Sequence, residues 1–276
     1  MSLPRHAFPA DWQAQADSLA DRVVLVTGPS GGLGRAAALA CQAAGATVVL
    51  AGRKVRKLEK VYDELKALGG AEPAIFPIDL AGASPRDYDS LVEALEREFG
   101  RLDGVVHAAA HFAGLTPLTM EKPDNWLLDL QVNLTAPLLL TQALQPLLMA
   151  APDPALVYLL DDPERLARAH WNGYGVAKAG LERMVAILHA ETATSKLRVH
   201  ALLPAPMRTG LRRLAWFAED ASAIALPEAS APAVVYLLAG AGGASARGGV
   251  LDLRAEAAGC ARGAIASDVQ DGMADG

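Results

Sequence analysis

The chain has little of several features that mark other classes of protein. Its two cysteines, Cys41 and Cys260, form neither a paired spacing nor a metal motif, so free thiols in a reducing cytoplasm are expected. It has no basic cluster of the size that nucleic-acid binding needs, and its net charge is −6. No apolar run is long enough to span a membrane, and residues 1–21 contain no apolar core of signal-peptide length. These absences argue against nucleic-acid and membrane partners and predict a cytoplasmic protein.

Apolar sequence, by contrast, is abundant. The 276 residues are 52% hydrophobic and 20% charged, which is enough to bury a large core. No linker rich in proline, glycine or serine divides the chain, and it has no internal repeat. We therefore predict one domain over residues 21–254, preceded by an N-terminal extension, residues 1–20, and followed by a flexible tail, residues 255–276.

Within this domain, apolar β-rich runs alternate with amphipathic stretches. The predicted strands are residues 22–27, 46–51, 74–78, 104–108, 155–160, 198–203 and 250–253. The predicted helices are residues 33–44, 55–68, 86–99, 123–149, 170–194 and 231–238, with Pro137 and Pro146 expected to bend the longest one. Continuous apolar strands separated by helices indicate a parallel sheet covered on both faces. With right-handed crossovers, this predicts an α/β fold, a Rossmann-type doubly wound parallel sheet of about seven strands.

A glycine-rich turn follows the first predicted strand and reads Thr27-Gly28-Pro29-Ser30-Gly31-Gly32-Leu33-Gly34. Gly28, Gly32 and Gly34 allow the backbone to approach a pyrophosphate, and the N-terminus of the next helix attracts the negative charge. Tight turns also use glycine, but the position after the first strand of an alternating pattern favours a dinucleotide site.

The end of the second predicted strand indicates which dinucleotide is bound. It reads Ala51-Gly52-Arg53-Lys54, where an NAD site usually has an Asp or Glu for the ribose 2′-hydroxyl. Arg53 can instead pair with a 2′-phosphate through charge-assisted hydrogen bonds, although an ordinary surface arginine would give the same sequence. We therefore expect NADP(H) as the cofactor.

A second pattern, far downstream, indicates proton transfer. Tyr174 and Lys178 stand one helical turn apart, and a phenol with a pKa of about 10 needs a nearby cation to ionise near neutral pH. A buried structural tyrosine beside a solvated lysine is the alternative interpretation. No serine or threonine lies between Thr141 and Tyr174, so the stretch before the tyrosine contains no aliphatic hydroxyl group.

Together these residues resemble the short-chain dehydrogenase/reductase superfamily over about residues 21–253. Further matches are the Asp79-Leu80 pair, Asn133 in the long predicted helix, and a segment over residues 204–209. The sequences at residues 102–105 and 169–174 are similar to a proteobacterial, NADP-preferring branch of that superfamily.

The resemblance implies a role for each site residue. Tyr174 would be the general acid/base, Lys178 would bind the nicotinamide ribose and lower the tyrosine pKa, and Asn133 would hold a proton-relaying water. It also implies a homodimer or homotetramer formed through the helices predicted at residues 123–149 and 170–194. The implied cofactor contacts are Gly28, Ser30, Gly32, Leu33, Gly34, Arg53, Asp79, Leu80, Ala109, Tyr174, Lys178 and Thr209.

Asp161 is the main departure from the family pattern, because it stands thirteen residues before Tyr174, at the position of the family serine. That serine donates a hydrogen bond to the substrate oxygen, and losing such a donor costs about 10²–10³ in rate in other enzymes. An ionised Asp161 cannot donate and would repel a developing alkoxide, whereas a protonated one could substitute if its pKa were strongly raised. In addition, residues 108–110 are three alanines in place of Asn-Ala-Gly, which removes a strand-bridging side chain, and Pro204-Ala205 replaces Pro-Gly.

Two functions fit this pattern best, ahead of different chemistry on the same scaffold, such as enoyl reduction or an Asp161-assisted isomerisation. One is an NADP(H)-dependent oxidoreductase that acts on a small-molecule carbonyl or alcohol by hydride transfer, which the Tyr174, Lys178 and Asn133 matches favour. The other is a non-catalytic NADP(H)-binding protein with a degenerate site, which Asp161 and the three alanines favour. No metal site is expected, because His107 and His111 straddle a strand end and no third ligand accompanies Asp161 and Asp162.

Overall fold

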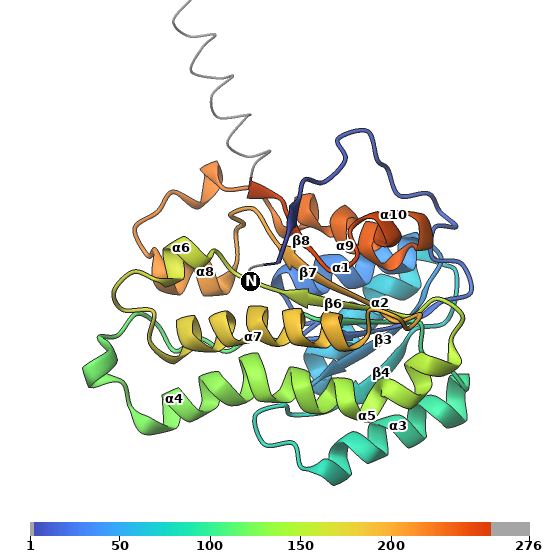
Figure 1. The fold of residues 1–276 in the computed structure, drawn as a ribbon, viewed down its shortest axis with the longest axis horizontal. Coiled ribbons are helices and arrows are strands. Elements are labelled where there is room, and N and C mark those ends of the chain that lie inside the picture. The colour runs from blue at the N-terminus through green and yellow to red at the C-terminus, as the bar shows by residue number, and fades with distance from the viewer. Residues whose placement is uncertain (1–2, 255–276) are drawn as a thin grey trace, which may run out of the picture.

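The computed structural model describes residues 3–254, which form an eight-stranded parallel sheet with helices on both faces (Figure 1). The strand order is β1-β8-β7-β6-β5-β2-β3-β4, so the direction of winding reverses between β2 and β5. In a sheet of this kind, ligands bind at the carboxyl ends of the strands beside that reversal. The strands are β1 (Arg5–His6), β2 (Val23–Thr27), β3 (Thr47–Gly52), β4 (Ala74–Pro77), β5 (Gly104–His107), β6 (Ala155–Leu159), β7 (Arg198–Leu203) and β8 (Val250–Asp252).

Helices cover the sheet in two layers (Figure 1). One layer contains α1 (Gly32–Ala43), α2 (Val55–Leu68), α9 (Ala231–Leu238) and α10 (Gly240–Ser245). The other contains α3 (Pro85–Phe99), α4 (Pro123–Leu130), α5 (Ala136–Ala150) and α7 (Asn172–Glu191). Two shorter helices, α6 (Pro163–Leu166) and α8 (Gly210–Ala215), lie beyond one end of the sheet.

The central strands are buried on both faces, as their continuous apolar sequences predict. Every residue of β2, β5, β6 and β7 is buried. Gly104 shows how closely a helix layer sits on them, because a Cβ there would lie 2.7 Å from a methyl carbon of Leu238 on α9. The predicted α/β fold, a Rossmann-type parallel sheet, is confirmed.

The predicted strands and helices are all present, with ends that shift by a few residues, except that the long helix at residues 123–149 is two helices. A π-helical turn, Gln131–Thr135, separates α4 from α5. Pro137 lies in the first turn of α5, directly after the π-helical turn, and the flanking Thr135 and Ala136 keep right-handed helical backbone angles. Pro146 lies inside α5, as predicted.

The N-terminal extension contributes an edge strand that the sequence pattern did not reveal. Arg5 pairs in parallel with Val250 and thereby adds β1 beside β8, which gives eight strands instead of about seven. Phe8 and Trp12 then pack edge-on against Tyr236 of α9, with ring centroids 5.5 and 5.2 Å away. A strand of two residues carries no periodicity, so only its partner could have identified it.

Cys41 is a buried free thiol, and burial raises its pKa to about 12. Cys260 and the tail predicted at residues 255–276 lie outside the described residues.

The stretch Ala221–Leu238 is apolar and long enough to cross a membrane by composition alone. In the fold it consists of two short 3₁₀ turns, Ala221–Ala223 and Pro227–Ser230, followed by α9. The whole of α9 except Pro232 is buried against the sheet and α1. The apolar character of this stretch is therefore that of a core helix and its connection.

Candidate active site

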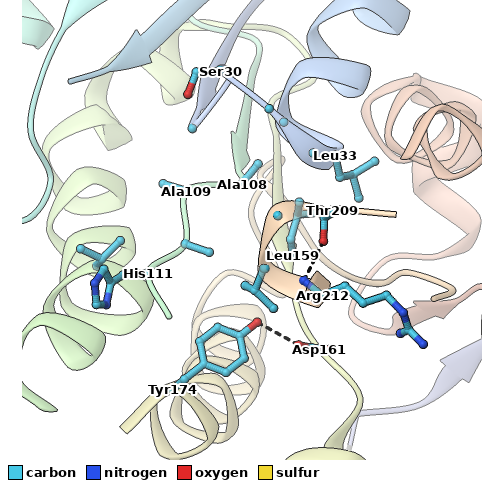
Figure 2. A pocket seen from close by; sticks show the side chains of 18 of the residues that line it. Ser30, Leu33, Ala108, Ala109, His111, Leu159, Asp161, Tyr174, Thr209 and Arg212 are labelled. Carbon is cyan, nitrogen blue, oxygen red and sulfur yellow. Dashed lines mark hydrogen bonds between the residues drawn. The ribbon is translucent and has the colours of Figure 1, made fainter. Parts of the chain in front are cut away.

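A cleft of about 520 Å³ opens at the carboxyl ends of the strands on both sides of the β2–β5 boundary. Every site residue predicted from the sequence lines this cleft, with the exception of Asn133. Segments far apart in the chain, from the glycine turn after β2 to the start of α7, therefore meet in one place. Figure 2 shows Ser30, Leu33, Ala109, Tyr174 and Thr209 around it.

The glycine turn packs directly against the end of β5. Gly28 has a φ of +64°, and a Cβ there would lie 2.6 Å from Ala109 Cα. Any other residue would push these two backbone segments apart. The helix that follows, α1, begins at Gly32 and has no acidic residue in its first turn. A helix N-terminus behind a turn without side chains is suited to a phosphate, so these residues fit the pyrophosphate of a dinucleotide.

Three cations, Arg53, Lys54 and Lys57, line the cleft where β3 ends and α2 begins. Their side chains are exposed, and the described part of the chain provides none of them with an ion pair or a hydrogen-bond acceptor. Asp79 and Leu80 follow β4 on the same side, where the Asp79 carboxylate accepts from the Ala81 N–H at 3.1 Å. This end of the cleft thus has unneutralised positive charge beside a small apolar surface.

Thr27 replaces the bridging side chain that the three alanines lack. Its buried Oγ1 accepts hydrogen bonds from the N–H groups of Ala108 and Ala109, each at 3.1 Å. The same hydroxyl donates to the carbonyl of Val106 at 3.4 Å. A side chain on β2, and not one in the loop after β5, therefore links these two segments.

Tyr174 and Lys178 lie in the first two turns of α7, and both are buried. The Tyr174 hydroxyl donates to Asp161 Oδ2 at 2.8 Å (Figure 2). Lys178 Nζ donates to the carbonyl of Leu159 at 2.8 Å and lies 5.9 Å from the centre of the Tyr174 ring. Burial lowers the pKa of Lys178 to about 8, against the opposing effect of Asp161. Burial and then the Asp161 charge raise the pKa of Tyr174 well above its ordinary value.

Asp161 follows β6 and accepts hydrogen bonds on both of its carboxylate oxygens. Oδ2 accepts from Tyr174, and Oδ1 forms an ion pair with the guanidinium of Arg165 and accepts the Asp162 N–H at 2.8 Å. Asp161 is therefore an acceptor in this arrangement, and its negative charge has a positive partner. Sequence analysis missed Arg165, although the spacing of four residues between an acid and a base was visible.

Asn133 lies in the π-helical turn, and its side chain is used entirely within the protein. Nδ2 donates to the carbonyls of His111 and Asp129, at 2.8 and 2.9 Å, and Oδ1 accepts the His111 N–H at 3.2 Å. Both side-chain N–H groups are therefore occupied, so a relay water at this position would have to bind elsewhere on the residue.

The two histidines lie in different surroundings. His107 is buried and stacks on Tyr158 with ring centroids 4.5 Å apart, and burial lowers its pKa to about 3, which makes it a neutral core residue. His111 lines the cleft, and its Nδ1 lies 2.7 Å from Oδ1 of the buried Asp129. Burial raises the pKa of Asp129, although the contact with His111 opposes this.

Comparison with known proteins agrees with this geometry. A family model described as short chain dehydrogenase matches residues 22–219. The chain belongs to the short chain dehydrogenase family. The oxidoreductase YciK of Escherichia coli K12 is 34% identical over 82% of this chain and 90% of its own length.

Solved structures of short chain dehydrogenases match the fold over most of its length. The crystal structure of Escherichia coli YciK has a TM-score of 0.83 at 33% identity and covers 88% of this chain and 98% of its own. A short chain dehydrogenase from Escherichia coli CFT073, complexed with NADPH, has a TM-score of 0.82 at 34% identity and covers 86% of this chain and 98% of its own.

Lys178→Met should stabilise this short chain dehydrogenase at pH 7. The pKa of Lys178 is lowered from 10.5 to about 8, so the folded state disfavours the cation at every pH below about 8. That shift corresponds to roughly 3 kcal/mol, of which about 1 kcal/mol is offset by the lost hydrogen bond to Leu159. The free energy of unfolding should therefore increase by about 2 kcal/mol.

This gain should shrink as the pH rises from about 8 to 10.5, because the lysine then also loses its proton in the unfolded chain. Urea unfolding followed by circular dichroism at pH 7 and pH 10 measures both effects. The exposed Lys57→Met is the matched control, with an expected change within about 0.5 kcal/mol. A Lys178→Met variant that is less stable than the wild type at pH 7 would contradict the assignment of a buried cation.

Proposed function

We propose that the protein is an NADP(H)-dependent oxidoreductase that interconverts a small-molecule carbonyl compound and the corresponding alcohol. One observation carries this proposal: the same cleft contains both the glycine turn and the Tyr174–Lys178 pair. Bound NADP(H) would supply or accept the hydride, and the residues of the cleft would bind and orient it.

Arg53 supports NADP(H) over NAD(H), since its guanidinium is exposed where β3 meets the cleft and has no ion pair with any residue that the structure describes. The relative complexed with NADPH supports the same choice. The glycine turn and the N-terminus of α1 would hold the pyrophosphate. Lys178 would hold the nicotinamide ribose, next to Tyr174.

Arg53→Ala should weaken NADPH binding about tenfold or more and leave NADH binding nearly unchanged, because a charge-assisted phosphate contact contributes roughly 1.5–3 kcal/mol. Fluorescence titration of the two cofactors measures the difference. Arg56→Ala is the control, because Arg56 is a nearby exposed arginine in the first turn of α2 that does not line the cleft. Equal losses for NADPH and NADH would show that Arg53 does not recognise the 2′-phosphate.

In the proposed reduction, Tyr174 transfers its hydroxyl proton to the substrate oxygen as that oxygen gains negative charge. The Lys178 ammonium, with its ring-centroid distance of 5.9 Å, stabilises the phenolate that remains. Burial of both groups excludes water and strengthens this interaction. In the oxidation direction, the phenolate would accept the proton of the alcohol.

The alternative is a protein that binds NADP(H) without turnover. The hydrogen bond from Tyr174 to Asp161 favours this alternative, because it stabilises the protonated phenol and thereby raises its pKa. Cofactor binding does not distinguish the two functions, whereas turnover does.

Tyr174→Phe should abolish turnover while NADPH binding persists, because the substitution removes one hydroxyl from a buried ring and no charge. The assay is oxidation of NADPH at 340 nm with a panel of aldehydes and ketones. Tyr62→Phe, which removes an exposed hydroxyl on α2, is the matched control and should keep full activity. Wild-type protein that binds NADPH but reduces no carbonyl compound would favour the non-catalytic alternative.

We further propose a homo-oligomer that buries the outer faces of α5 and α7. Leu138 and Met149 on α5 and Val176 and Ile187 on α7 are exposed apolar side chains. A two-fold axis would pair these faces with their copies and remove them from water. The free thiol Cys41 is in keeping with a cytoplasmic location for such an assembly.

Ile187→Asp should convert this oligomer into a monomer at micromolar concentration, because it places a charge in an apolar contact. Size-exclusion chromatography with light scattering gives the mass directly. Leu68→Asp is the control, since Leu68 is 52% exposed at the end of α2, on the other layer of helices. A wild-type monomer would remove the basis of the proposal.

A further inference from the structure

Asp161 links Tyr174 to a second group that the family pattern does not include. Its Oδ2 accepts the Tyr174 hydroxyl at 2.8 Å, and its Oδ1 is paired with Nη2 of Arg165. Arg165 lies on the short helix α6, one turn after Asp161, and lines the same cleft. The phenol, the carboxylate and the guanidinium therefore form one continuous chain of contacts at the edge of the cleft.

The Arg165 guanidinium is held in place by aromatic rings. Its central carbon lies 5.4 Å from the Trp171 ring centre and 5.0 Å from that of Trp216. These two rings are themselves 5.5 Å apart and tilted by 52°, so they form a corner around the guanidinium. Only 20% of the side chain is exposed. Arg165 is thus positioned before any ligand arrives, which is the arrangement that electrostatic catalysis requires.

Most hydrogen-bond donors of Arg165 have no acceptor. A guanidinium has five N–H groups, and within residues 3–254 only Nη2 has a hydrogen-bond partner. Nε is buried and has none. Buried donors normally have partners, so unused ones beside a cleft indicate an acceptor that arrives with a ligand.

We infer that Arg165 donates to the substrate oxygen the hydrogen bond that a serine at position 161 would otherwise supply. This inference rests on the proposed function and adds a catalytic residue to it. It assigns the reacting oxygen a place beside the Tyr174 hydroxyl, within reach of the Arg165 N–H groups that have no acceptor among residues 3–254.

Charge in the site supports this assignment. The carboxylate of Asp161 and the guanidinium of Arg165 neutralise each other, so a developing alkoxide meets a neutral pair and the nearby Lys178 cation. In reduction, the hydride forms the new C–H bond, the carbonyl π electrons move to oxygen, and Tyr174 gives that oxygen its proton. Arg165 donates hydrogen bonds throughout and transfers no proton, because a guanidinium stays charged.

The other arginines near this end of the cleft are already occupied. The Arg212 guanidinium lies 4.6 Å from the Trp216 ring centre, but it makes two hydrogen bonds of 2.6 Å to Glu219. Arg254 is paired with Asp162 and Asp252. Arg165 alone among these three contacts the carboxylate that holds the Tyr174 hydroxyl.

Turnover of Arg165 variants in two backgrounds tests the inference. Arg165→Met should lower kcat about 100-fold with little change in NADPH affinity, and Arg165→Lys, which keeps the charge, should recover about tenfold of that loss. In the Asp161→Ser background the hydroxyl supplies the donor, so Arg165→Met should cost less than threefold. Arg168→Met is the control, because Arg168 is exposed on the same segment and does not line this cleft.

A second measurement does not depend on turnover. Acetate, used as a small oxyanion probe at constant ionic strength, should produce a saturable change in tryptophan fluorescence, because Trp171 and Trp216 contact the guanidinium. The response should persist in Tyr174→Phe and Arg165→Lys and vanish in Arg165→Met. The inference is overturned if the acetate response survives Arg165→Met. It is also overturned if Arg165→Met alone, with Asp161 intact, keeps a kcat within threefold of that of the wild type. If no variant reduces any carbonyl compound, the proposed function fails, and the acetate response alone decides whether Arg165 is an oxyanion donor.

Discussion

The site depends on the close contact between the glycine turn after β2 and the loop after β5. Gly28 permits that contact, because a Cβ there would lie 2.6 Å from Ala109 Cα, and the Thr27 hydroxyl fixes it with two hydrogen bonds. Parallel pairing places all the strand ends at one edge of the sheet, and the reversal of winding beside β2 leaves a gap between the helix layers there. The glycine turn and the start of α7 can therefore face one cleft.

A second constraint is electrostatic. Lys178 is a cation inside the fold, and its burial lowers its pKa, so the folded state disfavours its charged form. Asp161 partly compensates for this, yet the same carboxylate raises the pKa of Tyr174. Arg165 then offsets the Asp161 charge from the other side. Buried charged groups lower the free energy of unfolding, and proteins usually keep them only where they serve a functional site such as a cleft.

Periodicity in the sequence was sufficient to predict the central strands and most helices, because they are long or fully buried, whereas the cleft residues were predicted from the glycine turn, the Tyr174–Lys178 spacing and the family resemblance. It could not predict β1, whose two residues become a strand only when β8 is beside them. The break at Gln131–Thr135 was also hidden, since a π-helical turn keeps the apolar pattern of a helix and differs in its backbone hydrogen bonds, such as the one from the Ala136 N–H to the Gln131 carbonyl. Contacts between distant segments decide both features.

Asp161 illustrates why a single substitution in a family pattern is hard to interpret without its neighbours. Considered alone, an aspartate in place of serine adds a negative charge where the reaction also develops one, which would favour a degenerate site. The structure pairs that charge with Arg165 and places the guanidinium against Trp171 and Trp216. On the proposal above, Asp161 would accept the Tyr174 hydrogen bond in the free protein, and the Arg165 guanidinium would supply the donor that a serine hydroxyl provides in the family pattern. Whether the site is active therefore depends on the pair and not on Asp161 by itself.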